Sequence, residues 1–95
     1  MAVSNIFKPF HLKTQDVKQE HIQVNSGGYQ YSSTNFTPPS GYKPMAIAGY
    51  RMDGSGVLIP IRMILSGNSV QWAFINRDSG TSDVTLTVRV LCAKG

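Results

Sequence analysis

The fold is decided by the stretch Val84-Thr85-Leu86-Thr87-Val88-Arg89-Val90-Leu91-Cys92, in which apolar and polar side chains alternate. One face carries Val84, Leu86, Val88, Val90 and Cys92, and the other carries Thr85, Thr87, Arg89 and Leu91. A period of two residues is typical of a β-strand with one buried face, whereas a helix would spread these side chains around its axis. The β-branched residues also favour a strand. We therefore expect residues 84–92 to form a strand that lines a core.

A second stretch, Ser69 to Asn76, alternates in the same way. It places Val70, Trp72 and Phe74 on the face expected to lie inside. Gly67-Asn68 before it and residues 76–80 after it are typical turn sequences. Further strands are expected at residues 17–25, 45–52 and 57–65.

The segment 57–65 is apolar on both faces apart from Pro60 and Arg62. Because proline has no backbone N–H, Pro60 favours a position at the edge of a sheet. An edge strand with two apolar faces is expected to pack against another subunit. The residues expected at this oligomer interface are Val57, Ile59, Ile61, Met63 and Leu65.

Residues 26–44 are rich in Gly, Ser and Pro, and we expect a loop-rich connector there. Few apolar residues lie near the tyrosines of this segment in the sequence, so we expect their side chains to be exposed. An exposed tyrosine can cover a C–H patch of a sugar, or it can lie between subunits, where aromatic residues are enriched. Both interpretations stay open. The ligand-binding candidates are Tyr29, Tyr31, Tyr42, Arg77 and Asp78.

Five or six short strands, separated by turns, predict an all-β fold. The expected architecture is a small antiparallel β-sandwich of jelly-roll-like type. The chain is expected to be a single domain overall. Within it, residues 1–37 would be an extended or strand segment that contributes to assembly, and residues 38–95 would be the sandwich body. Since a chain of 95 residues has a thin core of its own, we expect a homotrimer that shares its apolar surface.

The composition excludes several classes of protein. Only 15% of the residues are charged, 41% are apolar, and nine are glycine. These values do not fit charge-driven disorder or a coiled coil, and no apolar run is long enough to insert in a membrane. The net charge of +4 comes from scattered basic residues, so nucleic acid is not an expected partner. The single cysteine, Cys92, favours folding in a reducing cytoplasm and a buried thiol.

No catalytic, metal or cofactor site is expected. Glycoside hydrolysis requires two carboxylates that face each other across a sugar bond. Asp53, Asp78 and Asp83 instead lie in sequences typical of turns. His11 and His21 have no cysteine or glutamate at the spacing of metal ligands. The chain is therefore not expected to be an enzyme.

One set of segments resembles a known class of proteins. The segments are Ser40-Gly41-Tyr42-Lys43-Pro44-Met45-Ala46-Ile47-Ala48-Gly49-Tyr50, Leu65-Ser66-Gly67-Asn68, Phe74-Ile75-Asn76 and Val84-Thr85-Leu86-Thr87-Val88-Arg89-Val90-Leu91. Over residues 38–92 the chain is similar to the C-terminal β-domains of tail fibres, receptor-binding proteins and related structural proteins of tailed phages and prophages. The resemblance implies a trimeric β-sandwich in the virion, made in the bacterial cytoplasm. It also implies other tail proteins and a host cell-surface polysaccharide as partners.

Three alternatives remain open at this point. A stand-alone carbohydrate-binding module would show affinity for a sugar as a monomer. A fragment of a glycan hydrolase would lose turnover when one of Asp53, Asp78 or Asp83 is replaced. A purely architectural decoration or attachment protein of the virion would form stable trimers and bind no host glycan.

Overall fold

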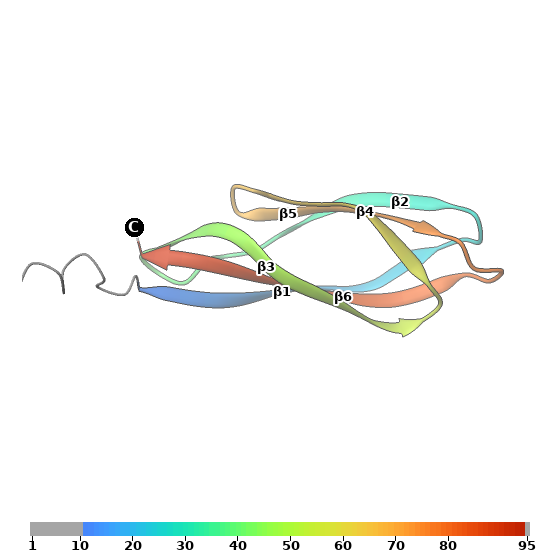
Figure 1. The fold of residues 1–95 in the computed structure, drawn as a ribbon, viewed down its shortest axis with the longest axis horizontal. Coiled ribbons are helices and arrows are strands. Elements are labelled where there is room, and N and C mark those ends of the chain that lie inside the picture. The colour runs from blue at the N-terminus through green and yellow to red at the C-terminus, as the bar shows by residue number, and fades with distance from the viewer. Residues whose placement is uncertain (1–10, 95) are drawn as a thin grey trace, which may run out of the picture.

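The computed structural model describes residues 11–94, which form six β-strands (Figure 1). In chain order the strands are β1 (Leu12–Val24), β2 (Tyr29–Asn35), β3 (Tyr42–Ser55), β4 (Leu58–Ser66), β5 (Ser69–Asn76) and β6 (Ser82–Lys94). All pairs are antiparallel, in a first sheet of order β1-β6-β3 and a second sheet of order β2-β5-β4. The predicted all-β, antiparallel fold is confirmed. Residues 11–94 contain no helix that could cross a membrane.

The hydrophobic core lies between the two sheets and is built around the central strands β5 and β6. In β6 the even-numbered side chains from Ser82 to Cys92 are buried, while their neighbours are half-buried or exposed. In β5 the side chains of Val70, Trp72 and Phe74 are buried in the same cluster. The alternation in the sequence correctly predicts the buried face of each strand. Successive side chains of a strand point to opposite faces, so a strand with one face in the core and one in solvent alternates apolar and polar residues.

The chain crosses between the sheets at four of its five connections, and only the β4–β5 hairpin stays within one sheet of the described residues. The strands run along the long axis of the molecule (Figure 1). The radius of gyration is 16.7 Å, against about 12 Å for a compact chain of this length. The molecule is thus an elongated, two-layered body. β1 and β2 lie together along one long side, and β3 and β4 lie together along the other.

Edge strands β1 and β4 contain irregularities where the pairing register shifts. In β1 the shift falls between Gln19 and Ile22 and includes His21, whose φ is +56°. In β4 the shift falls between Pro60 and Arg62, so Ile61 has no partner in the ladder to β5. Proline cannot donate to a ladder, and β4 accordingly occupies the edge position that Pro60 predicts.

The loop expected over residues 26–44 is interrupted by a strand. Residues 29–35 form β2, which pairs with β5 along its whole length. Tyrosine and threonine are good strand formers, and an edge strand tolerates the serines between them. Most of the segment expected as extended or strand, residues 1–37, is described: β1 and β2 place residues 12–35 in the two sheets, beside β6 and β5. Residues 1–10 of that segment lie outside the described residues.

Candidate interaction surfaces

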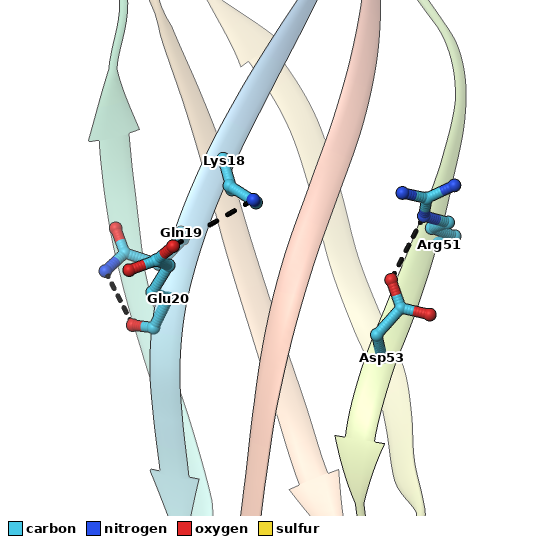
Figure 2. Close-up of polar contacts among 5 residues, drawn as sticks. All are labelled: Lys18, Gln19, Glu20, Arg51 and Asp53. Carbon is cyan, nitrogen blue, oxygen red and sulfur yellow. Dashed lines mark hydrogen bonds and ion pairs between the residues drawn. The ribbon is translucent and has the colours of Figure 1, made fainter.

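The outer face of the first sheet is polar. Along β6 it carries Thr85, Thr87 and Arg89, whose intervening neighbours face the core. Ion pairs flank them on both edge strands. Lys18 Nζ lies 3.9 Å from Glu20 Oε1 on β1, and Arg51 Nε lies 3.0 Å from Asp53 Oδ2 on β3 (Figure 2). Exposed pairs of this kind contribute little stability, but they make this face hydrophilic.

The outer face of the second sheet has a different character. Three rows of side chains lie across β2, β5 and β4 in the part of this face nearest Tyr29, set by the ladder pairs. The rows are Tyr29–Ile75–Ile59, Tyr31–Ala73–Arg62 and Ser33–Gln71–Ile64. The face therefore grades from apolar beside the β5–β6 turn to mixed and polar farther along β2.

A shallow groove of about 770 Å³ crosses the middle row. Tyr31 and Arg62 flank Ala73 from the two neighbouring strands, and the methyl side chain of Ala73 leaves a hollow between them. The Tyr31 ring lies nearly parallel to that of Tyr29, with centroids 6.3 Å apart and an angle of 16°. Arg62 Nη2 donates a hydrogen bond of 3.0 Å to Gln71 Oε1. One side of the groove is thus aromatic, and the other side is a positively charged, hydrogen-bonded pair.

Exposed apolar side chains gather along the side of the molecule formed by β3 and β4. Six of the nine large hydrophobic residues exposed among residues 11–94 belong to β3, β4 or the turn between them. We call this set the apolar side: Met45, Tyr50, Val57, Ile59, Ile61 and Ile64. Val57 is 61% exposed and Ile61 is 51% exposed. Single exposed apolar residues are ordinary, whereas a contiguous apolar strip indicates an interaction surface.

The opposite long side, along β1 and β2, is protected by polar groups. Lys18, Glu20 and Gln30 are exposed there, and the bulge at His21 interrupts the edge of β1. Charged side chains and bulges are the usual means by which an edge strand avoids pairing with another chain. The β4 edge also has a bulge, but isoleucines surround it. The β1 edge is therefore better protected against pairing with another chain than the β4 edge is.

The structure brings together part of the predicted ligand set. Tyr29 and Tyr31 share the groove face, 59% and 67% exposed, and Arg77 and Asp78 lie in the turn that follows β5 near Tyr29. Tyr42 lies at the opposite end, where β3 begins. There its ring is half-buried beneath the ammonium group of Lys13, 4.8 Å from the centroid.

Six residues that line the groove were not among the ligand-binding candidates, namely Ser32, Ser33, Ile61, Arg62, Gln71 and Ala73. The Tyr-x-Tyr-x-Ser alternation of β2 could have indicated Ser33. Nothing in the local sequence indicates Arg62 or Gln71, because their place beside Tyr31 follows from the pairing of three strands.

The predicted interface set is divided between surface and core. Val57, Ile59 and Ile61 are exposed, whereas Met63 and Leu65 are half-buried and pack against the core. The bulge at Ile61 is the reason, since an unpaired residue shifts the alternation of every residue after it. The exposed position beyond the bulge is therefore Ile64.

The three aspartates considered for catalysis lie in different surroundings in the described part of the chain. Asp78 lies in a turn as predicted, with its backbone N–H bonded to Asn76 Oδ1. Asp53 and Asp83, expected in turns, lie instead in β3 and β6. Asp53 pairs with Arg51, and Asp83 accepts hydrogen bonds from the side chains of His21 and Gln23. No group of three metal-ligating side chains is found among residues 11–94.

Comparison of the chain with protein-family models, with curated proteins and with solved structures gave no match. The apolar side and the groove are the two candidate interaction surfaces of the described chain.

Proposed function

We propose that this chain is a virion structural protein of a tailed phage or prophage, of the tail-fibre or receptor-binding type. In this proposal three copies assemble through the apolar side and present their outer faces to the host surface. The observation that carries the proposal is the difference between the two long sides of the molecule. Strands β1 and β2 expose mainly charges and amides beside Tyr29 and Tyr31, whereas six of the nine exposed large hydrophobic residues of the described chain lie on β3, β4 or the turn between them.

The edges of the sheets support assembly through this side. The apolar strip runs along an edge strand whose outward backbone groups are free to meet another chain. Each fully buried isoleucine or valine stabilises an interface by about 1.5–3 kcal/mol before association costs. Burial of several such residues, each about half exposed in the single chain, favours contact between copies.

The shape of the subunit favours closure around an axis. The strands run along the long dimension of the body (Figure 1), so three copies can bury their apolar sides around an axis parallel to the strands. A closed ring of three leaves no apolar side unpartnered, whereas an open arrangement would continue to grow. A slender trimer of this kind has the proportions of a fibre segment.

The proposed fold type is a reduced jelly roll. A jelly roll has eight strands in two sheets and is common in viral proteins and lectins. The present chain has six strands, and it crosses between its two sheets at nearly every connection. This path, together with the resemblance over residues 38–92, supports a virion role.

The assembly proposal is tested with two lysine substitutions at exposed positions. Ile61→Lys places a charge in the apolar side, and we expect the variant to sediment as a monomer with its β-type circular dichroism unchanged. Gln30→Lys places the same charge on the polar side and is expected to stay trimeric. Trimers in both variants, or monomers in both, would overturn the assignment of the interface.

A stand-alone carbohydrate-binding module is the second candidate, and the groove beside Tyr31 favours it. The two candidates differ in one respect that is easily measured. A module of this kind would bind sugar as a monomer, whereas the fibre-type protein binds as part of a trimer, where several weak sites act together. An architectural decoration protein would form the trimer without binding sugar.

A further inference from the structure

We propose that the groove across the second sheet binds an acidic saccharide, with Tyr29 and Tyr31 as the aromatic wall and Arg62 as the partner of the sugar carboxylate. The inference rests on the adhesive part of the proposed function and deepens it. It does not require the trimer, because the groove is complete within one chain.

The aromatic wall is built for a flat, partly apolar ligand. The Tyr29 and Tyr31 rings are nearly parallel and are more than half exposed, although the other large aromatic side chains of the second sheet, Trp72 and Phe74, are buried. Tyrosine combines an apolar ring face with a hydroxyl that stays in water. A pyranose ring has the matching pattern, with C–H groups on its faces and hydroxyls around its rim.

The groove is shallow. Ala73 lies at the centre of its middle row and is only 3% exposed, so the surface offered to a ligand is that of Tyr31 and Arg62 on the two neighbouring strands. At about 770 Å³ the groove lies within the size range of small-molecule sites.

The charge of the groove selects an acidic ligand. Arg62 is charged, and none of the residues that line the groove is a carboxylate. The bond to Gln71 uses one of the five guanidinium N–H donors and holds the planar group in place. The remaining donors match a carboxylate in bidentate geometry. Ser33 and the amide N–H groups of Gln71 supply further contacts suited to hydroxyls.

The other occupants fit less well. A nucleic acid would require several phosphate contacts, and the groove has a single basic residue. A second copy of the chain is served better by the apolar side. Ile61 belongs to both surfaces, and Ile59 and Ile64 lie in the rows on either side of Arg62. Charge complementarity therefore points to an acidic saccharide.

The test is a titration of the full ¹⁵N-labelled chain, followed by NMR, with trigalacturonate and with its neutral methyl ester. A trimer of N-acetylneuraminate and its methyl ester serve as a second pair. We expect at least one acid to shift the amide signals of Tyr31, Arg62 and Ala73, and to bind at least about tenfold more tightly than its ester. Equal affinity for acid and ester, shifts confined to other surfaces, or no shift with either acid at millimolar concentration would overturn the proposal.

Variants assign the effect to the groove. Arg62→Gln is expected to abolish the preference for acid over ester, and Tyr31→Ala to weaken both ligands about tenfold or more. The matched control is Arg89→Gln, which removes an exposed arginine from the outer face of the first sheet and is expected to bind as the parent does. Unchanged binding by Arg62→Gln contradicts the proposal even if Tyr31→Ala fails to fold.

The mass of each NMR sample, measured in parallel, separates the two proposals. A trimer without saccharide binding overturns the groove assignment and leaves the assembly proposal standing. A monomer that binds acidic saccharide does the reverse.

Discussion

Trp72 donates its indole Nε1–H to the hydroxyl oxygen of Thr34, 3.0 Å away, and the Thr34 hydroxyl in turn donates to Gln19 Oε1 at 2.8 Å. These three residues belong to β5, β2 and β1, so the chain of bonds links the second sheet to the first. The indole is 2% exposed and cannot find water in place of this acceptor. Thr34→Val keeps the shape of the side chain but leaves the buried N–H unpaired. We expect a loss of about 1–3 kcal/mol in the free energy of unfolding, measured by urea titration at fixed protein concentration.

Thr34→Ser is the matched control because serine keeps the hydroxyl. It is expected to retain most of the stability that valine loses. Equal losses in the two variants would show that the methyl group, and not the hydrogen bond, carries the effect.

Asn76 joins three segments at the end of the molecule where β5 ends. Its side chain is fully buried, and Nδ2 donates to the carbonyl oxygens of Val24 and Gly80, both at 2.8 Å. Asn76→Asp replaces this donor with an acceptor that faces two carbonyls. We expect a loss of about 3 kcal/mol or more at neutral pH, since a buried charge would be left unpaired. Asn35→Asp, at an exposed position in β2, is expected to change stability by less than about 0.5 kcal/mol. Similar midpoints of unfolding for the two variants would contradict this account.

Two glycines are expected to respond to alanine with opposite sign. Gly54 has a φ of +138°, and a Cβ added there would overlap with the backbone carbonyl oxygen of Asp83. Gly80 has no atom within 4 Å of the added Cβ and no positive φ. Gly54→Ala is expected to destabilise the fold by about 3 kcal/mol, through overlap and strain together. Gly80→Ala is expected to be neutral or to stabilise by up to about 1 kcal/mol, because it restricts the unfolded chain. Thermal midpoints of the two variants on the same side of the parent would be inconsistent with the turn geometry.

Cys92 offers a direct probe of the core. Its side chain is fully buried in the row of β6 residues that faces the second sheet. We expect its thiol to react with an aromatic disulfide reagent only as fast as the chain unfolds, and to react at once in denaturant. Rapid reaction of the native protein would mean that this end of the core is open.

The parts of the fold that could be predicted are the central strands. β5 begins at Ser69 and ends at Asn76 as predicted, and the even-numbered side chains of β6 are the buried ones. Both strands pair on their two edges and face the core on one side. The alternation of apolar and polar residues in each strand therefore shows which face is buried. Pro60 similarly identified β4 as an edge strand, because the missing N–H is a local property.

The parts that could not be predicted depend on pairing between distant strands. β2 is an edge strand with mostly exposed residues, so burial leaves little trace in its sequence. The bulge at Ile61 reversed the facing of Met63 and Leu65, and an inserted residue has no sequence signature of its own. The row Tyr31–Ala73–Arg62 joins residues that lie far apart in the chain, and only the register of two ladders brings them together.

Assembly through the apolar side is the central claim, and the mass of the native protein in solution tests it most directly. Light scattering on the full chain at micromolar concentration should give three times the chain mass of 10.4 kDa. A mass equal to a single chain over the same concentration range would contradict the claim.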